Sequence, residues 1–252
     1  MKYGIIGGSG LDDPRLIQDY QELEVDTPFG RPSSKFTVGK IGGQDVVILA
    51  RHGKEHSIMP SKVPYRANIW ALKEQGCTHI LATTACGSLK EDIKPGDFVF
   101  PDQFIDWTKC RPTTFFEDTD FTQASSGMKV VHTPMAEPFN AVLRDKLIAA
   151  AEKFDLKHHK KGTIITIEGP RFSTKAESHL FRSFGADVIN MSTVPEVILA
   201  NELNIPYQAI AMATDYDCWR AEEEAVTWEK IVKRMRENAD KVKQLIIQII
   251  QI

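Results

Sequence analysis

Short apolar runs alternate along the chain with longer stretches in which apolar residues recur every three or four positions. The short runs are nearly continuous in Val, Ile, Leu and Ala, which is typical of strands covered by helices on both faces. We predict strands over residues 2–6, 45–50, 79–84, 96–101, 162–167, 186–191 and 207–214. The alternation predicts one α/β domain over residues 1–252 with a mostly parallel sheet.

The longer stretches carry helix signals. We predict helices over residues 64–73, and over 137–154 with Pro138 in the first turn. A last helix begins near Trp228 and carries a core-facing apolar stripe, although residues 246–252 fit either a helix or a strand. The segment 102–135 shows weak periodicity, and a loop of that length is usually functional or an interface.

Two capping-box patterns mark further helix starts. Thr174 with Glu177 predicts one N-terminus, and Gly185 predicts the end of that helix. Thr193 with Glu196 predicts a second N-terminus in the same way.

Composition and charge act mainly by excluding classes of function. The chain has 252 residues, 31 Lys plus Arg against 34 Asp plus Glu, and a net charge of -3, so nothing indicates a nucleic-acid partner. No apolar run reaches the roughly 18 residues of a membrane span, and the first residues lack a signal-peptide pattern. The four cysteines are scattered, which favours reduced thiols in a cytoplasmic protein over a disulfide framework or a zinc site.

Polar clusters follow the early predicted strands. The first strand runs into a glycine-rich turn that contains Ser9, where backbone N–H groups can approach an anion, although a plain tight turn fits equally well. Arg51 and His52 follow the second strand, and an arginine at such a strand end offers a planar donor fork to a phosphate. Thr84 and Ala85 end the third strand, where anion binding and a capped turn are both open.

Residues 52–56 also spell the H-x-x-E-H pattern of some zinc peptidases. That chemistry needs both histidines on one helix face. Gly53 and the nearby Met59-Pro60 pair argue against a stable helix here, so we do not favour zinc.

The later strands end in a second set of candidate residues. Phe172 follows a Gly-Pro turn, where its ring can stack on a flat ligand or belong to the core. Asn190 and Ser192 follow the next strand, and Thr214, Asp215 and Asp217 follow the last one. Two carboxylates at positions i and i+2 point the same way, and apolar neighbours would raise the pKa of at least one of them. The same sequence also fits a pair of solvated aspartates in a turn. Together the clusters predict one composite site along the sheet edge.

These segments in this order resemble the purine nucleoside phosphorylase superfamily, and within it the family that cleaves 5′-methylthioadenosine. The resemblance covers the whole chain and rests on the segments GIIGGSGL, ARHG, ANIWALK, TTACGSL, HTPMAEPF, IEGPRF, NMSTVPE and ATDYDCW. It implies a three-layer fold with a central twisted mixed sheet flanked by helices. It also implies phosphorolysis of methylthioadenosine to adenine and 5-methylthioribose-1-phosphate in purine and methionine salvage, with phosphate as co-substrate, no metal and no organic cofactor.

The resemblance also implies residue roles. Phosphate would be held by Ser9, Arg51, His52, Thr84, the Ala85 N–H and Ser192. Met191, Asn190 and Thr214 would face the ribose and base, Phe172 would pack on the base, Asp215 would protonate N7, and Asp217 would accept from the 6-amino group. Trp228, Ile231 and Val232 would line the 5′ pocket, with His132 supplied by a neighbouring subunit of a homotrimer.

Substrate preference follows from hydrogen-bond chemistry. An ionised Asp217 only accepts, so it suits an exocyclic amine and opposes a 6-oxo group. We therefore expect adenine-type substrates, with a methylthioinosine or inosine phosphorylase and a non-catalytic nucleotide-binding protein as alternatives. Trp228 is larger than the residue typical of the family, and longer relatives add a segment after this helix that covers the 5′ group.

Overall fold

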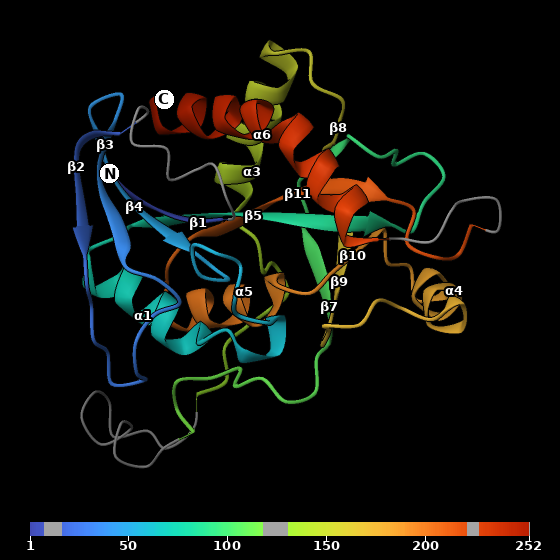
Figure 1. The fold of residues 1–252 in the computed structure, drawn as a ribbon, viewed down its shortest axis with the longest axis horizontal. Helices are drawn as coiled ribbons and strands as arrows, with labels where there is room; N and C mark the ends of the chain where they lie inside the picture. Colours follow the sequence, from blue (N-terminus) through green and yellow to red (C-terminus); the bar gives the residue numbers. More distant parts are fainter. Residues whose placement is uncertain (8–16, 118–130, 221–226, 252) are drawn as a thin grey trace.

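The computed structural model describes residues 1–7, 17–117, 131–220 and 227–251, and only the backbone at positions 228 and 230. In this part of the chain, one sheet of 11 strands is flanked by helices (Figure 1). Its strands are β1 Lys2–Gly7, β2 Gln18–Leu23, β3 Phe36–Ile41, β4 Gln44–Ala50, β5 His79–Ser88, β6 Phe98–Val99, β7 Gln103–Trp107, β8 His158–His159, β9 Thr163–Ile167, β10 Val188–Asn190 and β11 Tyr207–Asp215.

Strand β5 is the centre of the sheet. It pairs in parallel with β1 over its first half and with β11 along most of its length, while β10 pairs with its far end in the antiparallel direction. The main path runs β2-β3-β4-β1-β5-β10-β9-β7, with β11, β6 and β8 branching from it. The sheet is therefore mixed, as the resemblance implied.

Helices cover both faces of the sheet and make three layers (Figure 1). Helices α1 (Tyr65–Glu74) and α5 (Thr193–Glu202) contact each other in one layer, and α3 (Ala141–Lys153) contacts α6 (Trp228–Gln251) in the other. Helix α4 (Lys175–Ser183) lies apart from both pairs. The chain thus has the three-layer arrangement that the resemblance implied.

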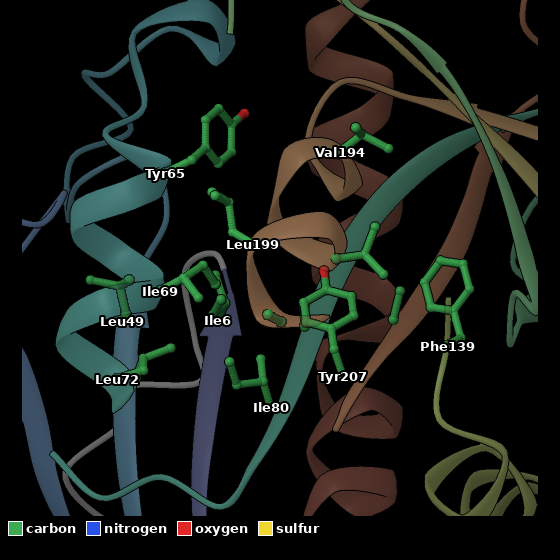
Figure 2. Packing of buried hydrophobic residues seen from close by; sticks show 14 of the residues in the cluster. Ile6, Leu49, Tyr65, Ile69, Leu72, Ile80, Phe139, Val194, Leu199 and Tyr207 are labelled. Carbon is green, nitrogen blue, oxygen red and sulfur yellow. The ribbon is translucent and has the colours of Figure 1, made fainter. Parts of the chain in front are cut away.

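The largest core cluster lies between the sheet and the α1–α5 layer (Figure 2). Ile69 and Leu72 of α1 are fully buried against Ile6 and Leu49 of the neighbouring strands. Fully burying each such side chain stabilises the fold by about 1.5–3 kcal/mol. A second cluster packs α3 and α6 against the opposite face.

Most predicted elements are confirmed, with shifted ends. All seven predicted strands exist, and β5 continues to Ser88, so Thr84 and Ala85 lie within the strand. Thr174 and Glu177 form the expected capping box, and Gly185 follows the end of α4 at φ 83°. Residues 246–251 belong to helix α6.

One predicted helix start is wrong, and at a second the start near Thr193 is confirmed but its capping box is absent. Helix α3 begins after Asn140, whose side chain accepts from the Leu143 N–H, and Pro138 lies outside it. Thr193 and Glu196 form no capping box, because the Glu196 carboxylate bonds to Arg51 and Tyr207 in the core. The Glu196 side chain therefore forms a buried ion pair with Arg51 and does not cap the N-terminus of α5.

Four strands lack a sequence prediction. Strand β2 is an exposed, polar edge strand, and β3 mixes buried with partly exposed positions, so neither shows a continuous apolar run. Strand β7 lies in the segment that the sequence analysis left as a loop, where it pairs in parallel with β9. Strand β8 is two residues long.

Candidate active site

A cavity of about 520 Å³ opens where strands β4, β5, β10 and β11 end, beside helix α6. Thirteen of the predicted site residues line it together: Arg51, His52, Thr84, Ala85, Phe172, Asn190, Met191, Ser192, Thr214, Asp215, Asp217, Ile231 and Val232. The carboxyl ends of strands in an open α/β sheet are where such proteins bind ligands. The composite site expected from the sequence therefore exists as one cavity.

Arg51 is buried, and three of its five guanidinium N–H groups already donate hydrogen bonds within the protein. Its Nε donates to Glu196 Oε1 at 2.5 Å and its Nη2 donates to Oε2 at 3.0 Å, while Nη1 donates to the Thr83 carbonyl at 2.8 Å. The same carboxylate accepts from the Tyr207 hydroxyl at 2.8 Å. Because a guanidinium has five N–H groups, one on each terminal nitrogen remains for an anion in the cavity.

His52 is held as a neutral ring. Its Nδ1 lies 2.8 Å from the Ile58 carbonyl, which can only accept, so Nδ1 carries the hydrogen. Burial, followed by the charge of Arg51, lowers the pKa of His52 to about 4. Near neutral pH its Nε2 is therefore a hydrogen-bond acceptor, suited to a protonated oxygen of a phosphate.

A cluster of hydroxyl groups surrounds the amide of Asn190. The Asn190 Nδ2 donates to Thr84 Oγ1 at 3.0 Å and to Thr193 Oγ1 at 2.6 Å, and Thr84 and Ser192 hydroxyls lie 2.9 Å apart. On the other side, Thr166 Oγ1 donates to Asn190 Oδ1 at 2.7 Å. This network fixes the directions in which Thr84 and Ser192 can donate.

The two aspartates at the end of β11 are held by neighbours of no positive charge. Asp215 accepts from the Thr214 hydroxyl at 2.6 Å and from the Asp217 N–H at 2.8 Å. Burial raises the pKa of both carboxyls, and the charge of Asp217 adds a smaller effect on Asp215. The predicted direction of these pKa shifts is confirmed, with desolvation as the main cause.

Local backbone geometry brings this carboxylate pair into the cavity. The pairing of β11 with β5 shifts register between Ala213 and Asp215, and such a bulge turns a side chain to a new direction. A Cβ on Gly87 of β5 would lie 3.1 Å from Asp215 Oδ1 and 3.2 Å from Asp217 Cβ. Gly87 therefore provides the space that the pair occupies, a role the sequence analysis did not assign.

Phe172 and Met191 form a second wall. The Phe172 side chain is 40% exposed on a turn that is anchored by a two-pronged ion pair from Arg171 to Glu177, both contacts at 2.7 Å. Gly169 in the same turn has φ 65°, and a Cβ there would lie 2.6 Å from Met191 Sδ. The turn thus packs directly on the methionine.

Helix α6 supplies the remaining wall. Ile231 and Val232 line the cavity as predicted, and further positions of the same helix join them: Met235, Arg236, Ala239 and Val242. His132 is exposed and does not line the cavity of this chain. Ser9 and the side chain of Trp228 lie outside the described residues.

The described residues give no support to a zinc peptidase. Residues 51–56 form turns, so His52 and His56 do not share a helix face, although their ring centroids lie 4.5 Å apart. Within the described ranges, no group of three or more His, Cys, Asp or Glu side chains is placed to hold a metal ion.

In the same ranges, no helix is long and apolar enough to cross a membrane.

Comparison with known proteins identifies what the chain is similar to. The sequence pattern of the phosphorylase superfamily matches residues 2–251. The S-methyl-5′-thioadenosine phosphorylase of Danio rerio is 56% identical over 247 residues, which are 98% of this chain and 87% of that protein. The enzyme of the same name from Xenopus tropicalis is 57% identical over 248 residues, with the same shares covered.

Solved structures give the same result. Methylthioadenosine phosphorylase from Schistosoma mansoni in complex with adenine superposes with a TM-score of 0.92 at 44% identity, over 99% of this chain and 91% of that chain. A variant of the adenosine/methylthioadenosine phosphorylase from that organism, in complex with methylthioadenosine, gives a TM-score of 0.91 at 43% identity, over 99% and 90% of the two chains.

Proposed function

This chain belongs to the phosphorylase superfamily, and on that premise we propose that it catalyses the phosphorolysis of 5′-methylthioadenosine. The products are adenine and 5-methylthioribose-1-phosphate, so the enzyme is a pentosyltransferase that serves purine and methionine salvage. The observation that carries the proposal is that Arg51, His52, Thr84 and Ser192 share one cavity with Asp215 and Asp217. A nucleoside phosphorylase needs both an anion site and an acid for the leaving base.

Phosphate is bound by donors and by one acceptor. The remaining N–H groups of Arg51, the hydroxyls of Thr84 and Ser192, the Ala85 N–H and the N–H and hydroxyl groups around Ser9 donate to its oxygens. Neutral His52 accepts from its protonated oxygen through Nε2. Asn190 acts mainly by orienting the hydroxyls, since its amide is already bonded to them.

In the reaction the C1′–N9 bond breaks as a phosphate oxygen bonds to C1′. The electron pair of the broken bond stays with adenine, and the ribosyl group passes through an oxocarbenium-like state stabilised by the adjacent phosphate charge. Asp215 delivers its proton to N7, so that adenine leaves as a neutral base. Burial favours the protonated carboxyl that this step requires.

Base selectivity comes from Asp217 and Phe172. An ionised Asp217 accepts a hydrogen bond from the 6-amino group, and Phe172 stacks on the purine ring from its anchored turn. A 6-oxo base would place an acceptor against this carboxylate, which can supply on the order of 10⁴-fold discrimination. Thr214 and Met191 complete the base and ribose contacts.

The 5′ methylthio group lies against helix α6. Ile231, Val232 and Met235 give this wall an apolar surface that suits a thioether. The active assembly is a cytoplasmic homotrimer of single-domain chains over residues 1–252, in which His132 of one subunit reaches the 5′ group bound in its neighbour.

A substrate panel tests the proposal. Methylthioadenosine, adenosine, methylthioinosine and inosine are each incubated with the protein, with and without phosphate, and the released base is measured. We expect adenine release from methylthioadenosine only when phosphate is present. Preference for 6-oxo substrates would replace the proposal with a methylthioinosine or inosine phosphorylase, and no base release at any phosphate concentration would leave a nucleotide-binding protein.

A further inference from the structure

One buried arginine outside the cavity lining connects the walls of the site. Arg111 follows β7 in the segment 102–135 and is 7% exposed. Its Nη1 donates to the carbonyls of Met191 at 2.8 Å and Val194 at 2.9 Å, and its Nη2 donates to those of Ile167 at 3.2 Å and Glu168 at 2.7 Å. These carbonyls belong to two separate segments, residues 167–168 and 191–194, that meet at the cavity.

The same guanidinium reaches a third segment through Tyr65. Its Nη1 donates to the Tyr65 hydroxyl at 3.0 Å, and that hydroxyl donates to the Pro60 carbonyl at 3.0 Å. The guanidinium also lies over the Tyr65 ring, 5.3 Å from its centroid. Pro60 lines the cavity, so this chain of contacts holds a further part of the wall.

Glu168 locks the loop that carries Arg111. Its Oε2 accepts from the Lys109 N–H at 2.7 Å and from the Cys110 N–H at 3.3 Å, while Oε1 lies 3.5 Å from Arg111 Nε. Burial opposes the charge of Glu168, but these N–H groups and Arg111 outweigh it and lower its pKa. The buried charge of Arg111 therefore has the Glu168 carboxylate beside it, although its hydrogen bonds go mainly to uncharged carbonyls.

From these contacts we infer that Arg111 is a positioning residue that sets the distance between Met191 and the Phe172 turn, and so the width of the nucleoside slot. The Met191 carbonyl and the Ile167 and Glu168 carbonyls bond to the same planar group, which cannot change its internal geometry. The Phe172 turn starts at Glu168 and packs on Met191 through Gly169. Arg111 itself does not line the cavity and has no part in bond breaking.

The inference rests on the proposed function, and it makes a prediction specific to one substrate. Arg51 and His52 lie in the turn after β4 and Thr84 lies on β5, and within the described residues Arg111 makes no hydrogen bond to either segment. Of the residues assigned to phosphate, only Ser192 lies between two of its acceptors, Met191 and Val194. A lysine keeps the positive charge, but its N–H donors all lie on one nitrogen, so it cannot bond to all four carbonyls at once. Arg111→Lys should therefore weaken nucleoside binding far more than phosphate binding.

The test measures steady-state kinetics with each substrate varied in turn. For Arg111→Lys we expect KM for methylthioadenosine to rise tenfold or more, while KM for phosphate stays within threefold of wild type. Arg144→Lys is the matched control, because Arg144 is a half-buried arginine on α3 that does not line the cavity, and we expect both KM values to stay unchanged. A lower kcat with both KM values unchanged would mean only a smaller folded fraction, and it would overturn the inference.

Two further measurements keep the test decisive. If Arg111→Lys does not fold, Tyr65→Phe removes one acceptor of the guanidinium and the link to Pro60, and should raise the nucleoside KM about two- to fivefold. No change in that variant would overturn the inference. The dissociation constant for adenine, measured by calorimetry without phosphate, separates the two claims, since failure of wild-type turnover refutes the proposed function while adenine affinity still tests Arg111.

Discussion

The cavity has an anion end, formed by Arg51 and His52, and a base end, formed by Asp215 and Asp217. The two ends differ in whether a buried charged group has a counter-charge beside it. At the anion end Arg51 is paired with the fully buried Glu196, and His52 is neutral, so the unliganded groups sum to about zero charge. At the base end Asp215 and Asp217 have hydroxyl, backbone and thiol neighbours, and within the described ranges they bond to no cation. Pairing preserves a charge in the interior, whereas burial without a counter-charge raises the pKa of a carboxyl.

This contrast matches the two tasks of the proposed reaction. An anion site must hold a permanent donor fork in one orientation, which the two-pronged Glu196 contact does. A general acid must be able to keep and release a proton near neutral pH, which a desolvated carboxyl can do. Phosphate then brings the negative charge that the anion end lacks.

The largest effect should come from removing the proton at the base end. We expect Asp215→Asn to lower kcat by about 10² to 10⁴-fold, because the leaving base loses its acid. Its thermal midpoint should stay at or above that of wild type, since a desolvated carboxyl is removed. Steady-state kinetics with calorimetry checks both, and near-normal turnover would show that Asp215 is not the acid.

The next effect comes from breaking the pair at the anion end. Glu196→Gln leaves Arg51 buried without its counter-charge, and should lower the free energy of unfolding by about 3–5 kcal/mol. Denaturant unfolding of this variant is compared with that of Glu24→Gln, which breaks the exposed Lys35–Glu24 pair and should change the free energy of unfolding far less. Equal losses in the two variants would contradict the contrast between the cavity ends.

The pH dependence of stability should differ in sign between the two ends. The pKa of His52 is lowered from 6.5 to about 4, so between these values the unfolded chain binds more protons, and stability falls as the pH falls. The raised pKa of Asp215 acts oppositely: the folded chain binds more protons above pH 3.8, and stability falls as the pH rises through that window.

Unfolding curves from pH 4 to 7 check these signs. His52→Gln should flatten the loss of stability on the acid side, and Asp215→Asn should steepen it, because each removes one of two opposing contributions. If both variants shift the curve in the same direction, one of the two assignments of protonation state is wrong.

The smallest effect should come from the hydroxyl network. Thr166→Val removes the donor to Asn190 Oδ1, and should raise the phosphate KM a few-fold and lower stability by about 1 kcal/mol. Thr163→Val on the same strand is the control, since the hydroxyl that bonds to Asn190 belongs to Thr166 while Thr163 contacts Asp187 through its backbone N–H. A nucleoside KM that changes more than the phosphate KM would show that Asn190 belongs to the base end.

The sequence by itself determined the alternation of elements and the residues that end the main strands. Continuous Val, Ile and Leu runs have only one stable place, between helices, so β1, β4, β5, β9 and β11 were predictable. The clusters at Arg51–His52, Thr84–Ala85, Asn190–Ser192 and Thr214–Asp217 were predictable as one site, because the ends of these strands meet at one edge of the sheet.

Only the tertiary structure decided the partners of the buried charges. Glu196 looks like a helix cap in the sequence, and it became the counter-charge of Arg51, which lies 145 positions away. Arg111 carries no local signal, because its acceptors are backbone carbonyls at the end of β9, directly after β10 and in α5. Local periodicity reports which face of an element is buried, but a contact between distant segments exists only after the chain has folded, so no short pattern can encode it.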